Sequence, residues 1–230
     1  MKAFVLCGGL GTRIKSISGS SPKCLLTVHD KPFLFYILDL LHSKGIREII
    51  LCTGYGHEHV VEKIGNSYKN LKIAYSKEEK PLGTGGAIIQ ALNKDDGEQF
   101  LVLNGDSYCD FDLPPERGSQ KSTSYIFVHE VPDVSRYGEV KVFPNSNQVR
   151  SFEEKNDNKH EGLINSGIYL FNRNIFYSYQ TSQKISLEND ILPNELGNLE
   201  SITCNQGFID IGTPQSYLDA SEFFTKKKLI

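Results

Sequence analysis

A glycine-rich turn and two basic residues near the start of the chain have the types and spacing expected of a phosphate-binding site. The apolar residues 3–6 lead directly into Cys7-Gly8-Gly9-Leu10-Gly11-Thr12-Arg13, and Ser21-Pro22-Lys23 follows shortly after. Glycines let backbone N–H groups approach a phosphate without obstruction, and the two cations can neutralise its charge. The turn has neither the ending of an ATPase loop nor the spacing of GxGxxG, so a plain tight connection is the alternative. Two cations beside one glycine turn suit a triphosphate.

Two aspartates, Asp106 and Asp210, are the candidates for holding Mg²⁺. Each is expected at the end of a strand, and Mg²⁺ takes carboxylate oxygens together with waters and substrate phosphates. The structural alternatives are an Asn-Gly-Asp turn at Asp106 and a helix-capping aspartate at Asp210. Asp110 and Asp112 lie nearby in the sequence and are reserve candidates.

The elements that must position these residues alternate between strand and helix in the first half of the chain. Short apolar runs predict strands, and apolar residues at helical spacing predict helices. The predicted strands are 3–7, 48–53, 71–75 and 100–104, and the predicted helices are 33–43, 57–64 and 86–92. This alternation favours a mainly parallel sheet with helices on both faces. Ligands of such sheets bind beyond the carboxyl ends of the strands, where the glycine turn and Asp106 both fall.

The second half of the chain has a different texture, with short β-rich runs separated by turn residues. The predicted strands are 123–130, 138–143, 149–152 and 163–171, and the predicted helices are 187–195 and 214–226. These runs indicate a mixed-sheet half. Because no linker or internal repeat separates the halves, we expect residues 1–112 and 113–230 to pack as a single domain around a shared cleft.

Composition agrees with one enzyme domain and excludes several other classes of protein. The 230 residues, 39% of them hydrophobic, suffice for a sizeable core. A net charge of −3 argues against a nucleic-acid partner, whose binding would need a basic face. Five cysteines without a CxxC pair indicate reduced thiols and a cytoplasmic location. No secretory signal or membrane-spanning segment is expected, so we predict no membrane partner, while a homo-oligomer stays open.

Six sequence blocks, spread over nearly the whole chain, occur together and in this order in one enzyme family. They are GGLGTR (8–13) with SPK (21–23), PLGTGGA (81–87), LNGD (103–106), FEEK (152–155), INSGIY (164–169) and FIDIGTP (208–214). With these blocks the chain resembles the sugar-1-phosphate nucleotidyltransferases, which make nucleotide-diphosphate sugars from an NTP and a sugar 1-phosphate. The resemblance implies the nucleotide-diphospho-sugar transferase fold, a Rossmann-like three-layer α/β/α arrangement with a mainly parallel mixed central sheet.

The resemblance also implies a role for particular residues. The catalytic positions are Arg13, Lys23, Asp106 and Asp210, with both aspartates as Mg²⁺ ligands. The nucleotide-binding positions are Leu6, Gly8, Gly9, Gly11, Thr12, Arg13, Lys23, Glu78, Gly83, Thr84, Asn104 and Gly105. The sugar-phosphate-binding positions are Gly138, Glu154, Lys155 and Asn165, so the second half would receive the sugar. Arg13 would stabilise departing pyrophosphate, Lys23 would lie near the α-phosphate, and Lys155 would grip the sugar phosphate.

The second glycine cluster and Glu78 would contact the nucleoside. Small residues at 83–86 permit close backbone approach to the base and ribose. A carboxylate at Glu78 would match guanine N1–H and N2–H₂. The blocks are most similar to the small bacterial D-glycero-α-D-manno-heptose 1-phosphate guanylyltransferases, which implies GTP and that heptose 1-phosphate as substrates. The alternatives are a mannose-1-phosphate guanylyltransferase, a uridylyl- or thymidylyltransferase for another sugar, and a non-catalytic nucleotide-sugar-binding regulatory subunit.

Overall fold

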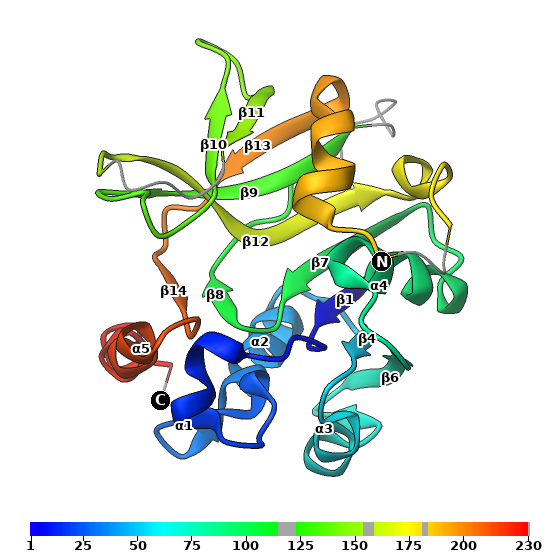
Figure 1. The fold of residues 1–230 in the computed structure, drawn as a ribbon, viewed down its shortest axis with the longest axis vertical. Helices are drawn as coiled ribbons and strands as arrows, with labels where there is room; N and C mark the ends of the chain where they lie inside the picture. Colours follow the sequence, from blue (N-terminus) through cyan, green and yellow to red (C-terminus); the bar gives the residue numbers. More distant parts are fainter. Residues whose placement is uncertain (115–122, 154–158, 181–183, 230) are drawn as a thin grey trace.

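A ten-stranded mixed sheet runs through the molecule and combines strands from both halves of the chain (Figure 1). The computed structural model describes residues 1–114, 123–153, 159–180 and 184–229. Within these residues the strand order is β11-β10-β12-β7-β1-β4-β6-β5, with β9 pairing with β12 and β13 with β9. None of the described helices is long and apolar enough to cross a membrane.

Four parallel strands form the first half of the sheet: β1 (Lys2–Leu6), β4 (Glu48–Thr53), β6 (Leu71–Lys77) and β7 (Gln99–Asn104). The helices that connect them are α2 (Phe33–Ser43), α3 (His57–Ile64) and α4 (Gly83–Ala91), and β5 (Ser67–Tyr68) is a short antiparallel edge. In register, Leu6 at the end of β1 lies beside Cys52 and Asn104. The carboxyl ends of β1, β4 and β7 therefore meet at one edge of the sheet.

Antiparallel pairing predominates in the second half. Its strands are β9 (Ser124–Val131), β10 (Glu139–Val142), β11 (Val149–Glu153), β12 (Gly162–Asn172) and β13 (Leu199–Thr203). The long β12 joins the halves, since it pairs antiparallel with both β7 and β9. Its register shifts between Asn165 and Ile168, where Gly167 has φ +77°, and a Cβ on Gly167 would lie 2.6 Å from the Asn104 amide nitrogen. Glycine is therefore required where β12 passes the end of β7.

Several short elements border the sheet. Strands β8 (Ser107–Cys109) and β14 (Phe208–Asp210) form an antiparallel pair, as do β2 (Thr27–Val28) and β3 (Lys31–Pro32). The remaining α-helices are α1 (Lys15–Ser18) and α5 (Pro214–Lys226). Single helical turns are η1 (Thr12–Ile14), η2 (Lys23–Leu25), η3 (Leu92–Lys94), η4 (Arg173–Phe176), η5 (Leu187–Ile191), η6 (Leu192–Asn194) and η7 (Leu196–Asn198).

Two hydrophobic clusters lie on opposite faces of the sheet. Alternate residues of β1 divide between them, with Ala3 and Val5 in one cluster and Phe4 in the other, as the period of a strand requires. Helices α2, α3 and α5 pack on the first cluster, whereas α4 and η5 pack on the second. The three-layer α/β/α fold expected from the sequence is confirmed.

Most predicted elements are confirmed, and one is wrong. The helices at 33–43, 57–64 and 214–226 and the strand at 48–53 have the predicted bounds. The predicted helix 187–195 is instead the π-helical turn η5 followed by the 3-10 turn η6. Ser186 accepts a side-chain hydrogen bond from the Asn189 N–H, and Pro193 has no N–H with which to continue a helix. Strand β13 was not predicted, because its five residues carry no long apolar run.

Candidate active site

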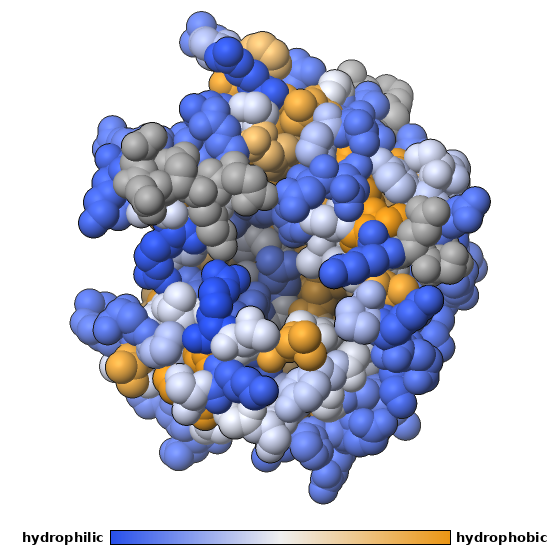
Figure 2. Space-filling model, viewed as in Figure 1, coloured by the Kyte–Doolittle hydropathy of each residue, from blue (hydrophilic) through white to orange (hydrophobic). Residues whose placement is uncertain are grey.

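Two adjoining cavities open at the carboxyl edge of the parallel strands, and a recess bordered largely by hydrophilic residues is visible there in Figure 2. The first cavity has a volume of about 380 Å³ and is lined by residues 6–13, Glu78, Gly83, Thr84 and 104–106. The second has a volume of about 690 Å³ and is lined by residues 136–139, 152–153, 165–167 and Asp210. The residues lining both are Arg13, Lys23, Asn104, Asp106 and Gly212. The predicted catalytic cations therefore lie where the cavities meet.

The glycine turn after β1 brings main chain to the wall of the first cavity. A Cβ on Gly8 would lie 2.5 Å from Glu78 Oε1 and 3.3 Å from the Gly54 backbone nitrogen, so a side chain there would require Glu78 to move. Gly11 has φ +59°, a backbone conformation that favours glycine, and it packs against Lys23. The structure thus brings together the predicted nucleotide positions Leu6, Gly8, Gly9, Gly11, Thr12 and Arg13. Arg13 is exposed at the border of the two cavities.

Lys23 and Asp106 form an ion pair at this border. Lys23 Nζ lies 2.6 Å from Asp106 Oδ2, with the lysine side chain 12% exposed and the aspartate side chain 42% exposed. Lys23 comes from η2 and Asp106 from the turn after β7, so the contact spans 83 positions in the sequence. The pairing directs the lysine toward the two cavities and leaves part of the carboxylate accessible.

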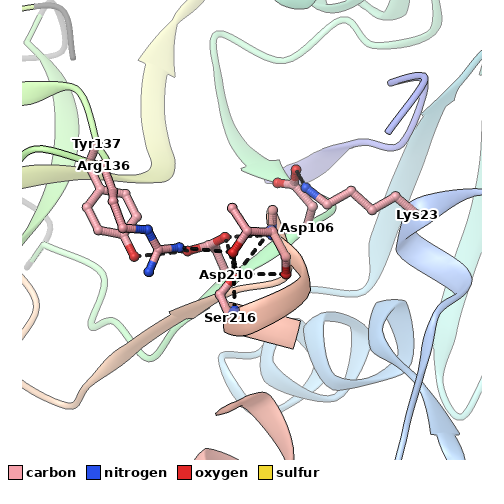
Figure 3. A network of polar contacts seen from close by, with 8 residues as sticks. Lys23, Asp106, Arg136, Tyr137, Asp210 and Ser216 are labelled. Atoms are coloured by element: carbon pink, nitrogen blue, oxygen red, sulfur yellow. Dashed lines mark hydrogen bonds and ion pairs between the residues drawn. The ribbon is translucent and has the colours of Figure 1, made fainter. Parts of the chain in front are cut away.

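Asp210 lies at the centre of a network of polar contacts (Figure 3). Its Oδ1 accepts hydrogen bonds from the Gly212 N–H (2.5 Å) and the Ser216 hydroxyl (3.0 Å). Its Oδ2 accepts from the Tyr137 hydroxyl (3.0 Å), and Arg136 Nη2 lies 3.6 Å from the same oxygen. Burial and, to a smaller extent, the charge of Asp210 raise the pKa of Tyr137 above its usual value, so this phenol stays protonated and donates.

The pairing of β8 with β14 brings the two predicted metal ligands together. Asp210 is in register with Ser107, and the Ile211 N–H donates to the Asp106 backbone oxygen at 2.9 Å. Both carboxylates line the second cavity. Among the described residues no group of three or more His, Cys, Asp or Glu side chains is placed to hold a metal. Two carboxylates that line one cavity beside the glycine turn nevertheless fit Mg²⁺, which commonly takes one or two carboxylates and completes its shell with waters and phosphates.

Glu78 lies in the wall of the first cavity, as predicted. Its Oε2 accepts a hydrogen bond from the Leu82 N–H at 2.8 Å, and its Oε1 faces Gly8. Burial raises the pKa of this carboxyl, and the hydrogen bond from Leu82 opposes that shift. Glu78 is thus a carboxylate held in place beside the glycine turn.

The second glycine cluster, which is predicted to contact the nucleoside, makes close contacts with residues 185–188. Gly83 and Thr84 line the first cavity, but the close backbone approach is to Ile185: a Cβ on Gly83 would collide with the Ile185 carbonyl oxygen, which accepts from the Gly85 N–H. Thr84 donates to Glu188 and accepts from the Leu187 N–H, both at 2.8 Å. The cluster therefore also fastens α4 to η5.

The predicted sugar-phosphate positions are described only in part. Gly138 and Asn165 both line the second cavity, where the Asn165 N–H donates to the Gly138 oxygen at 3.2 Å. The Asn165 side chain donates to the Tyr169 hydroxyl (2.6 Å) and accepts from the Gly167 N–H (2.9 Å). Glu154 and Lys155 lie outside the described residues.

The reserve candidates Asp110 and Asp112 lie away from the site. Each pairs with Lys44, at 2.8 Å and 3.0 Å, and neither lines either of the two cavities. Conversely, sequence analysis missed Arg136, Tyr137 and Glu139 in the second cavity. These three residues adjoin the predicted Gly138, which was the available signal. All five cysteines are free and buried, in line with reduced thiols.

Comparison with known proteins identifies the family of this chain. The family model described as nucleotidyl transferase matches residues 2–227. A D-glycero-α-D-manno-heptose 1-phosphate guanylyltransferase from Campylobacter jejuni is 41% identical over 219 residues, covering 94% of this chain and 97% of the relative. A protein of the same name from Aneurinibacillus thermoaerophilus is 38% identical over 227 residues, covering 96% of this chain and 97% of the relative.

Solved structures give the same result. The crystal structure of HddC from Yersinia pseudotuberculosis superposes with a TM-score of 0.85 at 36% identity, over 97% of this chain and 99% of that one. HddC complexed with GMP-PN has the same similarity. The matched family model covers nearly the whole sequence and the fold agrees, so this chain belongs to the nucleotidyl transferase family.

Proposed function

We propose that this chain joins GTP to D-glycero-α-D-manno-heptose 1-phosphate, producing the GDP-sugar and pyrophosphate. The observation that carries the proposal is the pair of adjoining cavities, which share Arg13, Lys23 and Asp106 at their border. Two substrates that must react with each other need such an arrangement. The choice of substrates is supported by two near-full-length relatives named as guanylyltransferases for this heptose and by the HddC complex with GMP-PN.

GTP occupies the first cavity in this proposal. The backbone of the glycine turn and Arg13 face the β- and γ-phosphates, and Lys23 neutralises charge near the α-phosphate. Glu78 accepts hydrogen bonds from guanine N1–H and N2–H₂, a pair of donors that adenine and uracil do not present. Leu6, Gly83, Thr84, Asn104 and Gly105 complete the contacts with the nucleotide.

The sugar 1-phosphate occupies the second cavity. Gly138 and Asn165 contact the sugar, and Glu154 and Lys155 are assigned to sugar hydroxyls and phosphate by sequence resemblance alone. The described wall of this cavity supports the assignment, because polar side chains of β10, β11 and β12 border it. Residues 1–112 and 113–230 then act as the nucleotide-binding and sugar-phosphate-binding halves of a single domain in the cytoplasm.

The reaction is an in-line displacement. An oxygen of the sugar phosphate attacks the α-phosphorus of GTP, the bond to the bridging oxygen breaks, and pyrophosphate departs on the opposite side. The protein contributes mainly by positioning the two anions and by stabilising the charge that develops. The position of Lys23 and Arg13 at the border of the cavities supports this role for them. Asp106 and Asp210 would hold Mg²⁺, which when bound would neutralise part of the phosphate charge.

A pyrophosphate-release screen tests the proposal. Purified protein with Mg²⁺ is assayed with GTP, ATP, UTP or dTTP, each combined with the 1-phosphates of the heptose, mannose or glucose. We expect GTP with the heptose to give a kcat/KM at least about tenfold above every other pair. Preference for mannose 1-phosphate would instead align the chain with mannose-1-phosphate guanylyltransferases, such as the Dictyostelium discoideum relative that is 34% identical. Nucleotide binding without pyrophosphate release would indicate a regulatory subunit.

A further inference from the structure

One buried carboxylate in the second cavity lacks a full set of partners. Glu139, at the start of β10, has a side chain that is 9% exposed. Its Oε1 accepts from His160 Nε2 at 3.1 Å, whereas its Oε2 has no hydrogen-bond donor among the described residues. Among the described residues, the nearest cation to Oε2 is Lys141 Nζ at 3.9 Å, beyond hydrogen-bond distance, and this lysine is bound to Glu153 at 2.7 Å.

The position of this carboxylate is determined by the strands around it. Glu139 is in register with Glu153 of β11 and Ile164 of β12, so its main chain is held from both sides. Gly162 provides space for the carboxylate, since a Cβ there would lie 3.1 Å from Glu139 Oε1. The side chain is therefore held at the wall of the cavity, and Oε2 keeps its place without a donor.

A comparison with Asp95, another buried acidic residue among the described residues, shows what distinguishes Glu139. Asp95 also has one oxygen without a hydrogen-bond donor, but its other oxygen pairs with Lys2 Nζ at 3.0 Å and it lines neither cavity. A buried carboxylate oxygen without a donor costs free energy. At the wall of a binding cavity, a bound ligand can supply the missing donor.

We propose that Glu139 recognises the sugar, its carboxylate accepting hydrogen bonds from hydroxyl groups of the sugar 1-phosphate in the second cavity. This inference rests on the proposed function. A carboxylate only accepts hydrogen bonds and repels phosphate, so the group it meets is an O–H. Among the described neighbours in this wall, the Glu153 carboxylate is paired with Lys141, and the Asn165 amide already bonds Tyr169 and Gly167, so Glu139 has the acceptor oxygen that lacks a partner. Lys141, which is 42% exposed, is the neighbour that can move aside for the hydroxyl.

The test couples changes in the protein to changes in the substrate. Wild type and Glu139→Gln are assayed for pyrophosphate release with GTP, using the parent sugar 1-phosphate and its monodeoxy analogues. With the parent sugar, we expect Glu139→Gln to raise the KM for sugar 1-phosphate roughly 10- to 100-fold, the effect of losing hydrogen bonds to a charged group. The KM for GTP should change less than about twofold, because Glu139 does not line the first cavity.

Coupling between the Glu139 substitution and the missing hydroxyl distinguishes sugar recognition from a merely structural role. For the hydroxyl that Glu139 binds, the deoxy analogue should be a poor substrate of the wild type. In Glu139→Gln the kcat/KM for the same analogue should be less than about threefold below that for the parent sugar, because the charged acceptor is already absent. Glu161→Gln, an equal change of charge at an exposed position of the same region, is the matched control and should behave as wild type. Melting temperatures check folding, and Glu139→Asp, which withdraws the carboxylate by one methylene, replaces a variant that fails to fold.

The outcomes separate this inference from the proposed function. A wild-type protein that releases no pyrophosphate with any sugar 1-phosphate overturns the proposed function and this inference with it. If the wild type is active but the loss of kcat/KM from Glu139→Gln adds independently to the loss from each missing hydroxyl, only the role of Glu139 is overturned. An equal rise in both KM values would likewise overturn it.

Discussion

The two cavities are built in different ways. The wall of the first is rich in glycine, because the turns after β1 and β7 and the start of α4 contribute glycines, several of them where a Cβ would crowd neighbouring atoms. The wall of the second includes side chains of the antiparallel strands, among them Glu139 on β10 and Glu153 on β11, together with Tyr137 just before β10. Backbone N–H groups can bind phosphate in any sequence with the right turn, whereas a sugar requires particular side chains. The difference predicts which substitutions affect which substrate.

The largest effect is expected at the border of the cavities, where the two halves meet. Asp106→Asn and Asp210→Asn should each lower kcat by about 100-fold or more and raise the Mg²⁺ concentration needed for half-maximal rate, because each removes a charge from the assembled site. Pyrophosphate release at varied Mg²⁺ measures both effects. Asp112→Asn is the control, since that carboxylate is 83% exposed and pairs with Lys44 away from both cavities. Unchanged pyrophosphate release by either variant would remove that residue from the site.

A smaller effect, on the KM for GTP, is expected from substitution of Glu78, a charged side chain in the first cavity. Glu78→Gln should raise the KM for GTP about tenfold, since it exchanges a charged acceptor for a neutral one, and leave the KM for the sugar 1-phosphate nearly unchanged. Because burial raises the pKa of Glu78, this carboxyl gains its proton at a higher pH than an ordinary glutamate. The wild-type KM for GTP should therefore rise as the pH falls through that pKa, and this part of the pH profile should be missing in the variant.

The stability of the fold should depend on Glu78 in the opposite sense. Since its pKa is raised in the folded protein, the stabilising contribution is fully present below the unfolded-state pKa and is lost as the pH rises through the folded-state value. Glu78→Gln should flatten this decline in denaturant unfolding measured across the acidic range.

A KM for GTP that follows the same pH profile in both proteins would exclude Glu78 from base recognition.

The smallest effect concerns the helix below the second cavity. Thr213 and Ser216 form a capping box at the start of α5, and Ser216 also donates to Asp210. Thr213→Ala should lower the free energy of unfolding by about 1 kcal/mol through loss of the cap. Thr225→Ala, in the last turn of the same helix, should change it by about 0.5 kcal/mol or less. Equal losses in the two variants, measured by urea unfolding, would contradict the assigned role of the cap.

Sequence analysis was most successful where local pattern decides structure. The alternation of apolar strands and amphipathic helices predicted the parallel half of the sheet, because the period of a buried face is set by the backbone geometry of each element. The turn at residues 8–11 was predicted from local pattern as well, since Gly11 has the left-handed backbone that favours glycine and a Cβ on Gly8 would crowd Glu78 and Gly54. The roles of this turn and of Lys23 in nucleotide binding stay predictions. The helix predicted at 187–195 was wrong because side-chain hydrogen bonds at Ser186 and the missing N–H of Pro193 outweighed its apolar spacing.

The sequence by itself thus determined the family, the order of strands and helices, and the glycine turn beside two cations, since these depend on residues close together in the chain. Only the tertiary structure decided that Asp106 pairs with Lys23, that Tyr137 and Ser216 hold Asp210, and that Glu139 keeps an oxygen without a donor in the second cavity. The physical reason is that these contacts join residues far apart in the sequence. The pairing of β8 with β14 and of β12 with β7 brings them together, and no local periodicity encodes either pairing.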